Sequence, residues 1–221
     1  MLVKDRMTTH LISVHPETTH KQASELMKEH HIHHLPVIDK QGHLVGIVVE
    51  EDLLAAQPSP ATTLSIYEIH GLLSKLQVRQ IMTHPVYTTT PDCPLEEAAR
   101  LMIDQGVGSL PVMDNDTMVG IITDTDIFEA LVSLLGGGQT GARFTLQVAD
   151  QPGVLAKVAQ TVANAGGNVV GVTAWYREGK AYITIKEHGA NFEQLRPALD
   201  ALDADVVDVR ERPDCIQKQY G

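Results

Sequence analysis

Hydrophobic and polar positions over residues 1–135 follow one pattern that occurs twice. In each copy, a segment with apolar residues at helical spacing predicts a helix, around residues 25–30 and 96–105. Two short apolar strands and another helix follow, and the strands read LPVID and LVGIV in one copy and LPVMD and MVGII in the other. With a strand before the first helix, the pattern predicts two β-α-β-β-α units in series.

The two copies align along their length with a gap of one residue. Pro36 pairs with Pro111, 75 positions later, and Gly46 pairs with Gly120, 74 positions later. A self-match at one period over so many positions is the signature of an internal repeat. The sequence therefore contains one small domain twice.

Three motifs shared by the copies resemble those of the CBS family, whose small modules pair in tandem as a Bateman module. They are VKDRMT and VRQIMT near the starts, the LPV strand, and a G-h-h-x-x-x-D segment at each second strand, in which h is apolar. The resemblance covers residues 1–57 and 75–135. It implies a regulatory module that binds adenosine compounds in two clefts.

Residues 58–74, between the copies, predict a linker helix. Pro58 and Pro60 end the preceding helix, and apolar residues then recur at roughly helical spacing. Because apolar helix faces are generally buried, we expect this one to pack on its own repeat pair. The apolar positions are Leu64, Tyr67, Leu72 and Leu76.

Residues 136–142 contain the run GGGQTG, which predicts a flexible hinge. Beyond it, residues 143–212 show strand and helix patterns in the order β-α-β-β-α-β, which is that of ferredoxin-like folds. Residues 213–221 form a C-terminal tail. The expected fold class is therefore α+β, with the repeats packed as a pseudo-symmetric pair before a ferredoxin-like domain.

Two motifs in this third block resemble those of ACT domains, which sense amino acids and related small molecules. They are D-x-P-G-V-L at residues 150–155 and A-x-x-G-x-N-V at residues 163–169. The resemblance implies ligand contacts across a dimer interface, from the loop before the first helix and the start of the second strand. Val148 stands where some members have a histidine, which disfavours serine-like ligands. The implied contact residues are Asp150, Gly153, Val154, Leu155 and Asn168.

The three parts in this order also resemble the acetoin-utilisation accessory (AcuB) family, with LLSKL before the second CBS copy and HHLPVID in the first. This resemblance implies a regulatory role in acetoin or related carbon metabolism without fixing a ligand. CBS pairs and ACT domains both bury faces against a second copy in their families, so we expect a homodimer.

In the second copy, the segment from Gly120 to Asp126 reads GIITDTD, which matches the segment with which CBS domains hold phosphate and ribose. The Thr123 hydroxyl can donate to a phosphate at a helix start, and the Asp126 carboxylate can accept both ribose hydroxyls. Both residues are also good helix N-caps, so a purely structural role stays open. The resemblance adds neighbouring residues to the expected nucleotide site: Thr88, Thr89, Val107, Gly108, Ser109, Leu110 and Pro111.

The first copy reads GIVVEED at the same place, so Val49 replaces the hydroxyl while Asp52 keeps the acid. Glu50 and Glu51 add two carboxylates in the same turn. Near a phosphate each would be repulsive by about 1 kcal/mol, even in water-like surroundings. This cleft therefore favours a nucleoside, or no ligand, over a polyphosphate. Its expected residues are Ile32, His33, His34, Pro36 and Asp52.

Composition and charge argue against several classes of function. The chain is 43% hydrophobic and 20% charged, which is typical of a folded globular protein. Its 17 Lys and Arg against 28 Asp and Glu give a net charge of -11, which disfavours binding to nucleic acid or anionic lipid. No apolar stretch suits a signal peptide or a spanning helix, so we expect a cytoplasmic protein. Cys93 and Cys215 have neither metal-ligand nor disulfide-framework spacing.

Four histidines form the densest polar cluster: His30, His31, His33 and His34. Histidine is a common transition-metal ligand, but such a run can equally decorate a solvated loop, and no HExxH pattern accompanies it. We expect no metal site and no cofactor. Nucleophile-elbow, P-loop, dinucleotide and metalloprotease motifs are absent from the sequence, which argues against an enzyme.

The sequence thus predicts a metabolite-sensing regulator of an unidentified protein. It would bind an adenine nucleotide of the AMP, ATP or S-adenosylmethionine class in the CBS module, and an amino acid or small metabolite in the ACT domain. The alternatives are a protein-interaction regulator with no small ligand, and a metal binder built on the histidine cluster.

Overall fold

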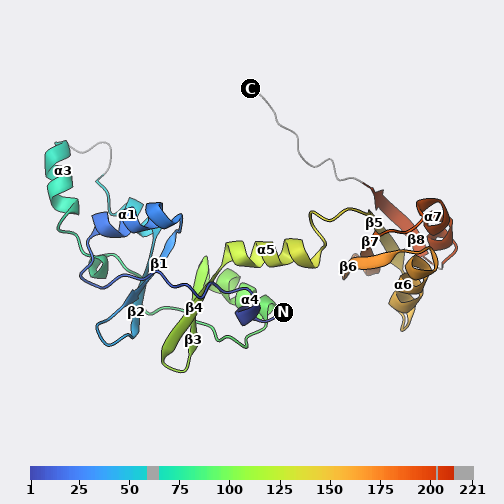
Figure 1. Cartoon of the computed structure of the whole chain (residues 1–221), viewed down its shortest axis with the longest axis horizontal. Coiled ribbons are helices and arrows are strands. Elements are labelled where there is room, and N and C mark those ends of the chain that lie inside the picture. Colours follow the sequence, from blue (N-terminus) through green and yellow to red (C-terminus); the bar gives the residue numbers. More distant parts are fainter. Residues whose placement is uncertain (59–64, 203, 212–221) are drawn as a thin grey trace. The chain divides into compact units, whose positions relative to one another are not determined.

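The computed structural model describes residues 1–58, 65–202 and 204–211, which Figure 1 shows as a ribbon. The chain divides into two compact units, Met1–Phe128 and Glu129–Gly221. The first unit contains nearly all of the two repeats, and the second contains the third block. Within the described ranges, no helix is long and apolar enough to cross a lipid bilayer.

The two repeats form the same local structure, which confirms the α+β fold expected from the pattern. Each has a helix, a two-stranded antiparallel hairpin and a second helix. The strand expected before the first helix is reduced to one parallel bridge, Val14 to Val37 in one repeat and Thr89 to Val112 in the other. The first repeat contains η1 (Val3–Asp5), α1 (His20–His30), β1 (His34–Ile38), β2 (Leu44–Val49) and α2 (Glu50–Ala55), and the second contains η2 (Val78–Gln80), α4 (Leu95–Gln105), β3 (Ser109–Asp114), β4 (Thr117–Thr123) and α5 (Asp124–Leu134).

The first segment of each repeat packs against the other repeat. Residues 1–8 bind the second repeat, where Val3 is fully buried and its amide donates to the Cys93 carbonyl at 2.9 Å. Thr8 and Ile121 exchange two backbone hydrogen bonds, of 2.9 and 3.0 Å, along the edge of β4. The start of the chain therefore completes the second repeat.

The reverse exchange completes the first repeat. The Val78 amide donates to the Thr18 carbonyl at 2.8 Å, and the Val78 side chain is buried in the core of the first repeat. Thr83 and Ile47 exchange two backbone hydrogen bonds, of 2.8 and 3.1 Å. Neither repeat therefore builds its core from its own residues alone.

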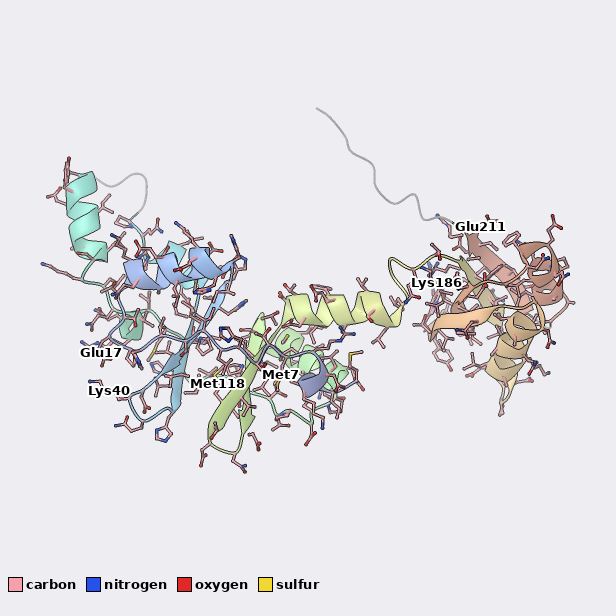
Figure 2. All side chains as sticks on the ribbon, viewed as in Figure 1. Met7, Glu17, Lys40, Met118, Lys186 and Glu211 are labelled. Carbon is pink, nitrogen blue, oxygen red and sulfur yellow. The ribbon has the colours of Figure 1, made fainter. Side chains whose placement is uncertain are left out.

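The exchange accounts for two glycines at equivalent positions in the second strand of each hairpin. A Cβ atom on Gly46 would lie 2.5 Å from Sδ of Met82, and one on Gly120 would lie 2.7 Å from Sδ of Met7. Both methionines belong to the exchanged segments, and Figure 2 labels Met7. Gly120 is more tightly enclosed, because the Thr8 carbonyl oxygen would lie 3.2 Å from its Cβ.

The linker contains helix α3 (Ile66–Leu73), and some of its apolar side chains are exposed to solvent. Tyr67 is 89% exposed and Leu72 is 56% exposed. The expectation that these two side chains pack on the repeat pair is therefore wrong. Leu76, beyond the helix, is half-buried, and its carbonyl accepts the His20 amide at 2.8 Å. Outside the described residues lie Pro60 and Leu64.

The third block forms a four-stranded antiparallel sheet with two helices, as the ferredoxin-like order predicts. The strand order is β6-β7-β5-β8, so the first and third strands of the block are neighbours at the centre. The core includes Phe144 and Leu146 from the sheet and Val158 and Leu195 from the helices. The elements are β5 (Ala142–Val148), α6 (Val154–Asn164), β6 (Asn168–Arg177), β7 (Lys180–His188), α7 (Phe192–Asp200) and β8 (Ala204–Arg210).

The glycine-rich segment before β5 is held against this sheet at two points. The Gly136 carbonyl accepts the ammonium of Lys186 at 2.6 Å, and Figure 2 labels Lys186. Gly141 adopts a φ of 131°, and a Cβ atom there would lie within 1.9 Å of the Glu187 carbonyl oxygen, so only glycine fits. The expected tail, residues 213–221, lies outside the described residues, as does residue 212.

Candidate functional site

A cleft of about 890 Å³ runs between the two repeats, and both repeats contribute to its walls. Residues expected at both predicted clefts line this cavity. The turns before β1 and β3 and the starts of α2 and α5 supply most of its polar side chains. Residues of the exchanged segments, among 8–12 and 83–87, complete the lining.

The start of α5 brings the expected residues Thr123 and Asp126 to the cleft. Oδ2 of Asp126 accepts the Thr123 amide at 2.7 Å and the Thr123 hydroxyl at 2.8 Å. In return, the Asp126 amide donates to Oγ1 of Thr123 at 3.3 Å. These contacts form a reciprocal N-cap, so both residues have a structural role. Both also line the cleft, and the cap leaves Oδ1 of Asp126 for a ligand.

The start of α2 in the first repeat has half of this arrangement. Oδ2 of Asp52 accepts the Val49 amide at 3.0 Å, but valine offers no hydroxyl in return. The Glu50 amide donates to the His33 carbonyl at 3.0 Å, and the Glu50 carboxylate lies 2.7 Å from Nδ1 of His33. His33, Val49 and Glu51 line the cleft, whereas Asp52 does not.

His34 of the first repeat reaches across to the second repeat. A Cβ atom on Gly108 would lie 3.2 Å from Nε2 of His34 and 3.5 Å from Oδ2 of Asp124, so both side chains approach this glycine. Burial lowers the pKa of His34 below its ordinary value, although the negative charges of Asp124 and Glu51 act in the opposite direction. Burial in the cleft therefore favours the neutral form of His34.

The residues expected at the nucleotide site divide into those that line the cleft and those that do not. Leu110 is fully buried in the core, because successive residues of a strand point to opposite faces and its neighbour Ser109 takes the cleft side. Thr89 is buried and pairs its backbone with β3. Lining the cleft are Ile32, His33, His34, Pro36, Val107, Gly108, Ser109, Thr123 and Asp126, and outside the lining are Asp52, Thr88, Thr89, Leu110 and Pro111.

The expected set omits the residues that the exchanged segments bring to the cleft. Thr8 and Thr83 occupy equivalent places in the two repeats, directly after a methionine, and both line the cleft. Because the two copies align in sequence, the repeat identifies Thr8 and Thr83 as an equivalent pair. Further lining residues outside the expected set include His10, Ile12, His31, Ile47, Glu51, Tyr87, Ile121, Asp124 and Thr125.

The histidine cluster contributes three side chains to the cleft, from His31, His33 and His34. One of them, His33, is hydrogen-bonded to Glu50, and His34 approaches Gly108. In the part of the chain that the structure describes, no group of three or more His, Cys, Asp or Glu side chains is placed to hold a metal ion.

The expected ACT ligand residues lie in the loop between β5 and α6 and at the start of β6. Oδ1 of Asp150 accepts the Tyr176 hydroxyl at 3.2 Å, and the negative charge of Asp150 raises the pKa of Tyr176. Gly153 adopts a φ of 89° at the N-cap of α6. Val154 lines a cavity of about 50 Å³, far below the roughly 300 Å³ at which ligand pockets begin. The remaining two, Leu155 and Asn168, are exposed.

Comparison with known families matches both units of the chain. The family model of the CBS domain matches residues 3–59 and 78–133, which together are more than half of the chain. That of the TTHA0829-like ACT domain matches residues 140–210. These matches fall on the two repeats and on the four-stranded sheet domain.

Individual similar proteins cover the repeat pair. A putative acetoin utilization protein (AcuB) from Vibrio cholerae superposes with a TM-score of 0.51 and 34% identity, over 61% of this chain and 92% of that one. The CBS domain pair of protein MJ0100, solved in complex with 5'-methylthioadenosine and S-adenosyl-L-methionine, has a TM-score of 0.51 and 29% identity, over 63% of this chain and 98% of that one. A CBS domain-containing protein from Dictyostelium discoideum is 33% identical over 136 residues, which are 61% of this chain and 94% of its own length.

Proposed function

Because the chain belongs to the CBS-domain family, with a tandem CBS pair followed by an ACT domain, we propose that it is a regulatory protein that senses an adenosine compound. The cleft between the repeats is the observation that carries this proposal. Its volume of about 890 Å³ is within the roughly 300 to 1,000 Å³ typical of small-molecule sites. The similar CBS pair of MJ0100 was solved with two adenosine compounds.

The lining suits the parts of an adenosine molecule. Ile32 and Val107 occupy equivalent places in the two repeats and give the cleft apolar walls against which an adenine ring can pack. Oδ1 of Asp126 is free of the helix cap and can accept the ribose hydroxyls. No step of this function requires a catalytic group or a cofactor.

The ACT domain would report on a second small ligand, such as an amino acid. The cavity beside Val154 is only about 50 Å³ in one chain, so this ligand would need walls from a second copy. A homodimer would supply them. A place in acetoin or related carbon metabolism, with an enzyme or other protein as the regulated partner, is supported by the similarity to the Vibrio cholerae protein.

Paired substitutions at the two helix caps test the proposed function. Asp126→Ala removes a helix-capping carboxylate that lines the cleft. Asp52→Ala removes the equivalent capping carboxylate of the first repeat, which lies outside the cleft lining. We expect Asp126→Ala to weaken binding of 5'-methylthioadenosine about 10- to 100-fold, because hydrogen bonds to charged groups contribute about 1.5 to 3 kcal/mol. Isothermal titration calorimetry on the full chain measures the dissociation constants.

The Asp52→Ala variant controls for loss of a cap. Each variant should lose about 1 kcal/mol of unfolding free energy, since each removes an N-cap acceptor. Asp52→Ala should leave the dissociation constant within about threefold of the parent, a difference of less than 1 kcal/mol. If neither the parent nor the variants bind any adenosine compound, the proposal is wrong.

Exposed apolar side chains favour a second candidate function, the binding of a partner protein without a small ligand. Tyr67 and Leu72 on α3 and Phe128 on α5 are each more than half exposed. Recovery of a stable complex with one partner protein, together with no heat or thermal shift from adenosine, S-adenosylmethionine or ATP, would favour this candidate.

A further inference from the structure

The cleft between the repeats has an unusual charge for a nucleotide site. Three carboxylates line it, from Glu51 at the start of α2 and from Asp124 and Asp126 at the start of α5. Over residues 1–58, 65–202 and 204–211, no lysine or arginine lines it. Phosphate groups in proteins are ordinarily held by such cations or by free amides at a helix start.

The amides at the start of α5 are not free. The Thr123 amide donates to Asp126, the Asp124 amide to the Gly108 carbonyl at 3.0 Å, and the Thr125 amide to Oδ1 of Asp124 at 2.7 Å. The Asp126 amide donates to Oγ1 of Thr123. Four successive donors that could cradle a phosphate are therefore occupied within the protein, and the carboxylates of the first turn already neutralise the positive end of the helix dipole.

The hydroxyl expected to contact a phosphate is occupied as well. The Thr123 hydroxyl donates to Oδ2 of Asp126 at 2.8 Å, so its single proton is used in the helix cap. Across the cleft, burial favours the neutral form of His34, and His33 is hydrogen-bonded to Glu50. The other polar side chains in the lining include the hydroxyls of Thr8, Thr83 and Ser109, which carry no charge, so they suit the hydroxyl and amino groups of a nucleoside and do not offset the charge of a phosphate.

We propose that this cleft selects phosphate-free adenosine compounds, such as adenosine, 5'-methylthioadenosine and S-adenosylmethionine, over AMP and ATP. The proposal rests on the proposed function and adds the chemical class of ligand. The selection comes from repulsion between a phosphate and three carboxylates, with no lysine or arginine among the described lining residues to offset it. A nucleoside is not repelled by these carboxylates, because it carries no negative charge. The Asp126 carboxylate can accept hydrogen bonds from its ribose hydroxyls.

Adenosine and AMP are the matched ligands for the test, because they differ only by the phosphate. Isothermal titration calorimetry on the full chain at pH 7.5, without divalent cations, should give a dissociation constant at least about tenfold larger for AMP than for adenosine. ATP should bind more weakly than AMP. 5'-Methylthioadenosine and S-adenosylmethionine should bind at least as tightly as adenosine.

A double variant, Glu51→Gln with Asp124→Asn, tests the cause. Both side chains are exposed, and the asparagine keeps an oxygen that can accept the Thr125 amide. The ratio of the AMP and adenosine dissociation constants should fall at least about threefold, because only AMP carries the phosphate that these carboxylates repel. Asp116→Asn, in the exposed β3–β4 turn outside the cleft, should leave the ratio at the parent value.

The outcomes separate this inference from the proposed function. If AMP or ATP binds as tightly as adenosine or more tightly, the charge selection is wrong while the adenosine-sensing function stands. An unchanged ratio in the double variant would also overturn it, because the carboxylates would then not be the cause. If no adenosine compound binds, the proposed function fails and this inference fails with it.

Discussion

The two CBS repeats end their second strand in the same way but for one side chain. At the end of β4, Thr123 and Asp126 bond reciprocally, whereas at the end of β2, Asp52 accepts an amide from Val49, which returns nothing. Both helices nevertheless start at the equivalent residue. The aspartate carboxylate alone therefore suffices to start the helix at this position, and only the second repeat adds a threonine hydroxyl to the cap.

The exchanged segments give the largest expected difference between the repeats. Gly120→Ala should destabilise the CBS unit by about 2 to 3 kcal/mol, because the new Cβ meets Met7 and also the Thr8 carbonyl, which cannot move without breaking the pairing with Ile121. Gly46→Ala should cost only about 1 kcal/mol, since Met82 is a flexible side chain that can shift. Urea unfolding followed by far-UV circular dichroism measures both.

The single tryptophan supplies an internal control for this experiment. Trp175 lies in β6 of the ACT domain, so its fluorescence follows the second unit. Neither glycine substitution should move the midpoint of the fluorescence transition as far as that of the dichroism transition. If Gly46→Ala is less stable than Gly120→Ala, the Thr8 carbonyl does not make Gly120 the more tightly enclosed of the two glycines.

Local features of the fold could be predicted from the sequence because local patterns determine them. The LPV and VGI strands pair through Pro36 with Ile47 and through Pro111 with Ile121, and the sequence repeat alone predicts this equivalence. The order of elements in the ACT domain follows from its strand and helix patterns. The site residues next to these elements, Thr123 and Asp126, do line the cleft.

Features that depend on contacts distant in sequence could not be predicted in this way. The repeat pairs Thr8 with Thr83, but it does not show that residues 1–8 complete the second repeat, so Thr8 is not among the predicted site residues. Periodicity predicts an apolar face on the linker helix, but it does not show what covers that face, and Tyr67 and Leu72 are exposed. Similarly, the pattern identifies Thr123 as a hydroxyl donor, but it does not show that this hydroxyl donates to Asp126.

The residues that end the first helix of each repeat give a smaller expected difference. His31 and Gly106 both adopt the left-handed conformation, with φ of 53° and 65°. Glycine has no penalty there, so Gly106→Ala should cost about 1 kcal/mol, and His31→Gly should stabilise the CBS unit by about 0.5 to 1 kcal/mol. A Cβ on Gly106 meets nothing within 4 Å, so its cost is conformational.

Urea unfolding at pH 7.5 compares these two variants with the parent. The double variant that exchanges the residues, His31→Gly with Gly106→His, should return close to the parent stability, because one left-handed non-glycine residue is merely moved. If His31→Gly is destabilising, the histidine makes a contact that outweighs its backbone strain, and the two positions are not equivalent.

The smallest expected difference concerns pH, because His34 in the first repeat corresponds to Ser109 in the second. Burial lowers the pKa of His34 in the folded protein, so the unfolded chain binds this proton more readily. The contribution of neutral His34 to stability is therefore fully present above the unfolded pKa, about 6.5, and is lost as the pH falls below it.

The variant His34→Ser copies the second repeat and removes this group. The unfolding free energy of the parent, measured in urea at pH 7.5 and 5.5, should fall more on acidification than that of His34→Ser. If the unfolding free energy falls equally in the two proteins, the pKa of His34 is the same in the folded and unfolded states, and its burial beside Gly108 does not disfavour protonation.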